Sequence, residues 1–116
     1  MTTRVAVYGL LRRGERLAHL LEGARLIEQV TLRGFDLFDL GSYPAAVAGT
    51  GVLVAEVYEL ASAEQLAPLD EAEGVDEDPP LYRRVALDAR TWIYLYARTT
   101  TSAPRIASGD WIRRRE

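Results

Sequence analysis

The chain contains no cysteine, no lysine and a single histidine, His19, among its 116 residues. Without cysteine there is neither a thiol nucleophile nor a disulfide framework, and a histidine-centred mechanism would depend on His19 alone. No second metal ligand lies at a suitable spacing from His19, and a histidine among leucines is typical of a packed or capping residue. The sequence therefore indicates no metal site and makes aspartate and glutamate the expected proton carriers.

Long apolar runs and an excess of positive charge are also missing. No run approaches the roughly 20 apolar residues that span a bilayer, and Arg4 leads directly into a strand pattern without the apolar region of a signal peptide. We therefore expect a cytoplasmic protein without a membrane segment. The formal net charge of -3 disfavours nucleic acid binding. The run of Arg113, Arg114 and Arg115 is typical of a solvated chain end, with contact to an acidic partner as the alternative.

Five segments are rich in β-branched and aromatic residues, which predicts five strands. They lie at residues 4–8, 25–40, 51–60, 81–87 and 91–97. Gly34 predicts a bulge or bend in the second strand, and residues 41–44 predict a loop after it. Residues 88–90 predict a hairpin between the last two strands. The polar residues after position 98 predict irregular structure with a turn at residues 108–111.

Two segments predict short helices. Leucines recur at three- and four-residue spacing over residues 17–24, which predicts a short amphipathic helix or a single helical turn that Gly23 ends. Ser62 followed by Gln65 has the form of a capping box, in which both side chains bond the first amides of a helix. Pro68 predicts that this second helix consists of two short turns, with Pro68 at the start of the second, and Gly74 predicts its end.

Strands outnumber helices, and several connections are too short for parallel crossovers. With 48% hydrophobic and 27% charged residues, the chain can bury one sizeable core. We therefore predict a single domain over residues 1–116 with an α+β fold. Its architecture is expected to be a small mixed, largely antiparallel β-barrel with short flanking helices, although periodicity alone does not establish closure of the barrel.

Glu73 lies in an acidic stretch that has six carboxylates in the nine positions 70–78. One interpretation is a solvated residue at the end of a surface helix, which is the usual meaning of such a run. The other is a functional carboxylate whose pKa is raised toward neutrality by partial burial or by like-charged neighbours, so that it both accepts and delivers protons. The residues alone leave both interpretations open.

The turn at residues 9–14 is the second candidate for chemistry. Gly9 permits a close approach of the backbone, and consecutive amides of such a turn can point at a bound carboxylate or carbonyl oxygen. An ordinary turn between two elements is the alternative. The turn lacks the glycine pattern and the Lys-Ser/Thr pair of a phosphate loop, so nucleotide binding is not supported.

Six short blocks together resemble the gamma-glutamylcyclotransferase-like family, in the order that this family has them and over nearly the whole chain. They include Tyr-Gly-Leu-Leu after the first strand and Leu-Asp-Glu-Ala-Glu-Gly at the end of the second helix. The blocks lie at residues 7–14, 41–45, 51–58, 69–74, 81–85 and 109–111.

The resemblance implies a cavity that holds a gamma-glutamyl group, which is cyclised to 5-oxoproline with release of an amine. It implies that Glu73 is the general acid/base and that no metal or cofactor takes part. The implied substrate-binding residues are Tyr8, Gly9, Leu10, Leu11 and Tyr82. Many members carry Thr or Ser where Leu10 stands, a departure that bears on specificity more than on the type of reaction.

The implied chemistry needs few groups. Because the α-amine of the substrate attacks its own γ-carbonyl, the protein mainly has to enforce a folded geometry. One carboxylate can carry the proton from the attacking nitrogen to the leaving amine, while turn amides stabilise the oxyanion. Glu73 would be this carboxylate, and residues 9–11 would supply the amides.

Aromatic side chains cluster in two further places. Trp92, Tyr94 and Tyr96 share one face of a predicted strand and are expected in the core or in the wall of a cavity. Tyr43 and Pro44 are expected at the mouth of that cavity.

Arg83 and Arg84 project to opposite faces of a regular strand. An inward arginine is a candidate to balance Glu73 or a substrate carboxylate, and the sequence does not assign this role to either of the two. Two rival hypotheses remain: a noncatalytic module that binds a small amino-acid-like ligand, and an interaction domain that uses the terminal arginines. The sequence assigns neither the amine of the substrate nor an oligomeric state.

Overall fold

A mixed five-stranded sheet forms the centre of the molecule in a computed structural model, which describes residues 2–100 and 102–115. The strand order is β2-β3-β1-β5-β4, and every neighbouring pair is antiparallel except the parallel pair β1 and β5. The elements are β1 (Arg4–Val7), η1 (Ala18–Leu21), β2 (Arg25–Asp39), β3 (Pro44–Glu59), η2 (Ala63–Gln65), α1 (Leu66–Ala72), β4 (Tyr82–Ala86) and β5 (Thr91–Tyr96). The predicted α+β class with a mixed, largely antiparallel sheet is confirmed.

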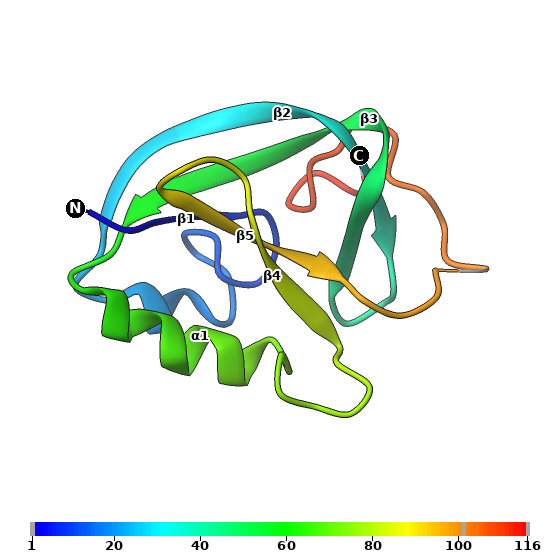
Figure 1. Cartoon of the computed structure of the whole chain (residues 1–116). Coiled ribbons are helices and arrows are strands. Elements are labelled where there is room, and N and C mark those ends of the chain that lie inside the picture. The colour runs from blue at the N-terminus through cyan, green and yellow to red at the C-terminus, as the bar shows by residue number, and fades with distance from the viewer. Residues whose placement is uncertain (1, 101, 116) are drawn as a thin grey trace.

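The sheet is curved but open, because β2 and β4 are its edges and do not pair with each other in the described part of the chain. The expectation of a closed barrel is therefore too strong. The long β2–β3 hairpin arches over the molecule and then bends sharply (Figure 1). The bend lies where the register shifts between Arg33 and Phe35, at the predicted bulge of Gly34, whose φ is 91°.

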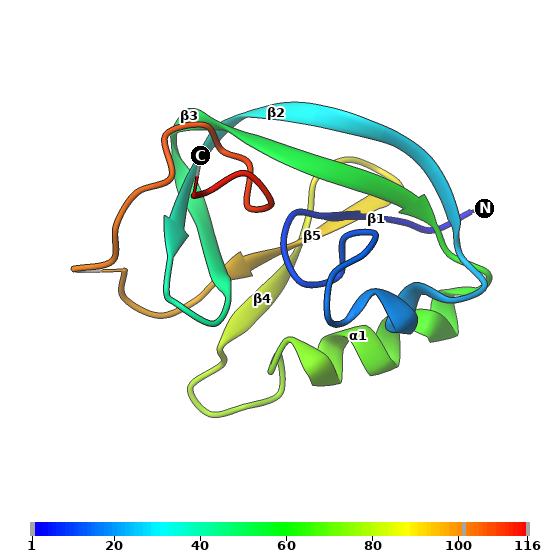
Figure 2. The same cartoon turned by 180° about the vertical axis from the view of Figure 1, so that it is seen from behind.

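The C-terminal segment lies on the inner side of this bend (Figure 2). The N–H of Ile106 donates to the Leu37 carbonyl at 2.7 Å, and the N–H of Val54 donates to the Gly109 carbonyl at 2.8 Å. Trp111, 1% exposed, is packed into the core on this side. Arg114 lies over the Trp111 ring, 3.6 Å from its centroid, so the expectation of a solvated tail is wrong for this residue.

Strand β3 begins at Pro44, seven residues earlier than predicted. Residues 45–48 are mostly alanine, so their strand character comes from pairing with β2 rather than from their own propensity. The predicted loop is a tight hairpin turn, in which the N–H of Gly41 donates to the Asp39 carboxylate at 2.7 Å. Proline is tolerated at Pro44 because it is the first residue of the strand.

Residues 17–24 form a single 3-10 turn, η1, which confirms the expected helical turn rather than a longer helix. His19 is exposed, so it is not the packed residue that was one of its two expected roles, and it lies in the last turn of η1. Ser62 makes no capping bond. Gln65 instead accepts a hydrogen bond from the Ala61 N–H at 3.0 Å and donates to the Glu22 carbonyl at 3.1 Å, which ties η2 to the end of η1.

The second predicted helix consists of two consecutive pieces, η2 and α1, as expected. Pro68 lies in the first turn of the second piece, two residues after its first residue, Leu66. A proline is tolerated there because the first amides of a helix have no partner within it. Gly74 follows the C-terminal cap with a φ of 64°, as predicted. No helix in the described residues is long and apolar enough to cross a membrane.

The strands alternate between two cores. Val5 and Val7 of β1 face one hydrophobic cluster with η1 and α1, whereas Ala6 and Tyr8 face the cluster that contains Trp111. Helix α1 covers the first face, and the C-terminal segment covers the second (Figure 1). The end of α1 is thereby brought next to the turn that leaves β1.

Candidate active site

A pocket of about 240 Å³ opens between the turn after β1, the start of β3, the end of α1 and strands β4 and β5. All six residues predicted for the site line it, although they come from three separate parts of the chain. The lining consists of Ala6, Val7, Tyr8, Gly9, Leu10, Leu11, Arg16, Leu17, Tyr43, Pro44, Ala72, Glu73, Leu81, Tyr82 and Tyr94. The predicted placement of Tyr43, Pro44 and Tyr94 at the cavity is confirmed as well.

Gly9 packs against the ring of Pro44. A Cβ on Gly9 would be 2.4 Å from the Cγ of Pro44, so only glycine fits this close approach. The carbonyl groups of Gly9 and Leu10 accept hydrogen bonds from the N–H of Arg12 at 3.0 Å and from the N–H of Leu17 at 2.8 Å. By contrast, the N–H groups of residues 9–11 donate no hydrogen bond within the described residues. Three successive donors beside the pocket are therefore available to a ligand.

A buried charge network holds this turn from behind. Arg12, 3% exposed, donates to Glu56 at 2.9 Å and to Asp110 at 2.8 Å. Glu56 also accepts the backbone N–H of Arg13 at 2.7 Å and the hydroxyl of Tyr58 at 3.2 Å. The network joins the turn to β3 and to the C-terminal segment, and sequence reasoning missed it. The available signal was a glutamate inside the apolar run of β3, since a buried charge requires a partner.

Glu73 is the C-terminal cap residue of α1, and it lines the pocket. The residue is partly buried, and its carboxyl makes no hydrogen bond or ion pair with another described residue. Burial raises the pKa of Glu73 to about 7. Desolvation is the only cause, so the neighbouring acids of residues 70–78 do not contribute the like-charge repulsion considered from the sequence.

Three tyrosines surround Glu73, and each donates its hydroxyl to the protein. Tyr8 donates to the Tyr94 carbonyl at 2.6 Å, Tyr82 donates to the Pro44 carbonyl, and Tyr94 donates to the Asp70 carboxylate at 2.6 Å. Burial is the main cause that raises the pKa values of all three phenols, and the charge of Glu73 adds to each. The phenols therefore stay protonated and form a rigid wall.

Asp70, and not Glu73, has an arginine side chain as its partner. Arg84 forms an ion pair with Asp70 at 3.0 Å and lies 4.4 Å from the centroid of the Trp92 ring. Arg83 is exposed. Neither arginine lines the pocket, so neither takes the candidate role of balancing Glu73. The pocket has a different arginine, Arg16, which sequence reasoning did not identify.

The described residues contain no group of three or more histidine or carboxylate side chains placed to hold a metal ion. The pocket thus combines one carboxyl that binds a proton near neutral pH with residues 9–11, whose amides donate no hydrogen bond within the described residues. Such a pair is suited to moving a proton beside a carbonyl whose oxygen is held by hydrogen bonds.

Comparison with known proteins identifies the family of the chain. The family model of gamma-glutamyl cyclotransferase, AIG2-like, matches residues 5–113. The gamma-glutamylcyclotransferase family protein YtfP of Escherichia coli K12 is 33% identical over 114 residues, which cover 96% of this chain and 97% of YtfP. A Vibrio cholerae protein provisionally named a gamma-glutamylcyclotransferase is 40% identical over 95% of this chain and 96% of its own length.

Solved structures show the same fold. The crystal structure of an uncharacterized protein from Pyrococcus horikoshii superposes with a TM-score of 0.77 at 31% identity, covering 94% of this chain and 89% of that protein. The similarity thus extends over the strands, the turn after β1 and helix α1 together. This chain is a member of the gamma-glutamyl cyclotransferase, AIG2-like family.

Proposed function

We propose that this protein is a cyclotransferase that converts a gamma-glutamyl amide to 5-oxoproline and a free amine, with Glu73 as general acid and base. The observation that supports it is the isolated carboxyl of Glu73, with its pKa raised to about 7, in a pocket that also presents the amides of residues 9–11. The family membership agrees with this class of reaction.

The reaction is an intramolecular aminolysis. The α-amine nitrogen of the glutamyl group attacks its own γ-carbonyl carbon, and a five-membered ring forms through a tetrahedral intermediate. The carboxylate of Glu73 takes the proton from the attacking nitrogen and delivers it to the nitrogen of the departing amine as the original amide bond breaks. Proton transfer is balanced, because the carboxyl begins and ends the cycle ionised. No external nucleophile, metal or cofactor enters this scheme.

The rest of the pocket supplies geometry. The amides of residues 9–11 hold the γ-carbonyl oxygen as it becomes an oxyanion, a role that needs no side chain and therefore tolerates Leu10. The buried rings of Tyr8 and Tyr82 restrict the glutamyl chain to folded conformations in which the amine lies near the carbonyl. The attacking and leaving nitrogens both remain within reach of one carboxyl.

The direct test is incubation with a panel of gamma-glutamyl dipeptides and gamma-glutamyl amines, followed by mass detection of 5-oxoproline. We expect turnover by the unmodified protein and its loss in Glu73→Gln, while the folded structure and ligand binding remain. Binding without 5-oxoproline from any compound would instead indicate the noncatalytic binding module. Equal turnover by Glu73→Gln and the unmodified protein would remove Glu73 from the mechanism.

A further inference from the structure

Arg16 is the only cationic side chain among the described residues that line the pocket, and Glu73 is the only anionic one. Arg16 is exposed, whereas Tyr8, Tyr82 and Tyr94 on the inner wall are 3–5% exposed. The hydrogen bond from the Leu17 N–H to the Leu10 carbonyl, at 2.8 Å, holds the backbone after Arg16 against the turn. The guanidinium therefore belongs to the solvent-facing rim of the pocket, beside the substrate-binding turn.

The exposed guanidinium of Arg16 differs in pairing from the guanidinium groups of the buried and half-buried arginines. Arg12, Arg84 and Arg114 each have an acidic or aromatic partner within the protein. Arg16 forms no hydrogen bond or ion pair with another described residue. An unpaired guanidinium at the mouth of a pocket is suited to bind an anionic group of a ligand, above all a carboxylate.

We propose that Arg16 selects substrates whose leaving amine carries a carboxylate, so that gamma-glutamyl amino acids react better than gamma-glutamyl amines. This inference rests on the proposed function, which places the glutamyl group between Glu73 and the amides of residues 9–11. With the reacting bond in the inner part of the pocket, the leaving amine extends toward the rim. An amino acid there places its carboxylate beside Arg16, whereas a simple amine leaves Arg16 without a partner and a polyamine places a like charge against it.

A matched pair of compounds tests the proposal: gamma-glutamylalanine and gamma-glutamylethylamine, which differ only in the leaving-group carboxylate. The unmodified protein should prefer gamma-glutamylalanine in kcat/KM by roughly tenfold or more, since hydrogen bonds between charged groups are stronger than neutral ones. Arg16→Gln should abolish that preference by lowering kcat/KM for gamma-glutamylalanine alone. Equal turnover of the two compounds by the unmodified protein would overturn the proposal.

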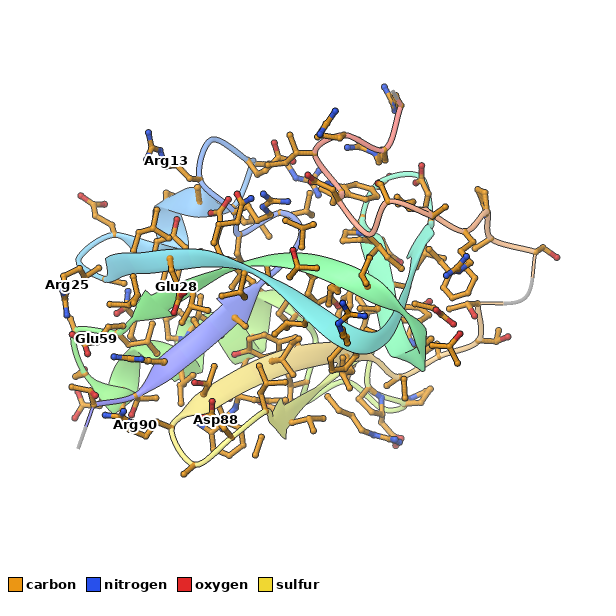
Figure 3. All side chains as sticks on the ribbon, turned by 90° about the horizontal axis from the view of Figure 1, so that it is seen from above. Arg13, Arg25, Glu28, Glu59, Asp88 and Arg90 are labelled. Carbon is orange, nitrogen blue, oxygen red and sulfur yellow. The ribbon has the colours of Figure 1, made fainter. Side chains whose placement is uncertain are left out.

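Arg13→Gln is the control variant, because it also removes one positive charge from the segment between β1 and η1. Arg13 is exposed, projects away from the body of the molecule (Figure 3) and does not line this pocket. It should leave both kcat/KM values unchanged. If Arg13→Gln matched Arg16→Gln, the preference would arise from net charge and the proposal would be wrong. Equal losses on both compounds in Arg16→Gln would also overturn it, because Arg16 would then bind the glutamyl carboxylate that both share.

Failure of the proposed function is recognised separately. If neither compound yields 5-oxoproline, the reaction assigned above is wrong, and calorimetric affinities of the same two compounds then decide the role of Arg16. Tighter binding of gamma-glutamylalanine that disappears in Arg16→Gln supports the proposal. Equal affinities, or no binding of either compound, overturn it.

Discussion

Two glutamates flank the same turn after β1 and have opposite surroundings. Glu56, 6% exposed, accepts hydrogen bonds from the Arg12 guanidinium, the Arg13 amide and the Tyr58 hydroxyl. Glu73, on the pocket side, has no such partner, and burial raises its pKa to about 7. Glu56 is buried and Glu73 is partly buried, yet the protein compensates the negative charge of Glu56 alone.

The difference in surroundings suits Glu56 to stabilising the fold and Glu73 to exchanging a proton. A buried carboxylate with a guanidinium and further donors around it stays ionised and fastens the elements that it joins. A carboxyl that is desolvated without a partner is less stable as an anion and exchanges its proton near neutral pH. Glu56 holds the turn in place, and Glu73 lines the pocket beside that turn.

Exchanging each carboxyl for an amide should therefore give opposite results. Glu73→Gln is expected to lower kcat by about 100-fold to 10,000-fold, the usual contribution of general acid–base catalysis, while unfolding in urea stays unchanged or shifts to higher concentration. Glu56→Gln is expected to lower stability and to keep most of the activity of the molecules that remain folded. Urea titrations measure the stability of both variants, and 5-oxoproline assays measure their activity. Similar losses of stability in the two variants would contradict the proposed difference between Glu56 and Glu73.

Removing the cation of the buried network should cost more stability than any change within the pocket. Arg12→Met leaves Glu56 and Asp110 without their common partner, and breaking a buried pair in this way costs about 3–5 kcal/mol. The free energy of unfolding from urea titration is the measurement. Arg13→Met is the matched control, since its exposed side chain should have little effect. A loss below about 1 kcal/mol for Arg12→Met would mean that the network is not needed to hold the turn.

Stability should depend on pH through Glu73. Its pKa is about 7 in the folded protein and lies near the usual 4.5 when unfolded, so the unfolded chain releases this proton first as pH rises. The folded protein should lose about 3 kcal/mol through this group between pH 4.5 and 7.5, a loss that Glu73→Gln avoids. The comparison is made by measuring the unfolding free energy of both proteins across that range. Parallel curves would show that the carboxyl is not desolvated.

Catalysis should follow the same titration in the opposite direction. The carboxylate form of Glu73 accepts the first proton, so kcat/KM of the free enzyme should rise through a pKa of about 7. Stability thus declines over the interval in which activity increases. A pH profile of kcat/KM that is flat between pH 6 and 8 would contradict this assignment.

The smallest expected effect concerns the wall of the pocket. Tyr94→Phe removes the hydrogen bond to Asp70, which keeps its ion pair with Arg84. The loss should be about 1 kcal/mol in unfolding free energy, because Asp70 retains a charged partner. A modest decrease of kcat/KM is expected as Tyr94 loses its fixed orientation in the wall. A loss as large as that of Arg12→Met would place Asp70 and Tyr94 in a second essential network.

The fold was predictable where residue patterns act locally. The five strands are present because β-branched and aromatic residues occupy them, and the bulge at Gly34 and the helix end at Gly74 follow from a left-handed φ. Of the two outcomes expected for residues 17–24, a short helix or a helical turn before Gly23, the structure forms the turn, because short helices depend on tertiary packing and here packing stabilises only one 3-10 turn. The early start of β3 escaped prediction because its alanines form a strand only through pairing with β2.

The candidate site was predictable mainly through the resemblance of short blocks to a family, and less through the physics of each residue. Glu73 and the turn at residues 8–11 were singled out in this way and do line one pocket. The roles of Glu56 and Arg84 were not predicted, because the partner of a charged side chain is chosen by packing. Asp110 reaches Arg12 from 98 residues away along the chain.

The amino-acid sequence by itself determined which chemistry was available: no thiol, one histidine, many carboxylates, and strands whose glycines permit tight turns. Only the tertiary structure decided which carboxyl has a pKa raised toward neutrality. Burial is the sum of what surrounding elements contribute, and the pocket around Glu73 is assembled from β1, β3, β4 and β5 as well as its own helix. Desolvation and ion pairing depend on neighbours in space, so two glutamates with the same side chain have different surroundings, and burial raises the pKa of Glu73 to about 7.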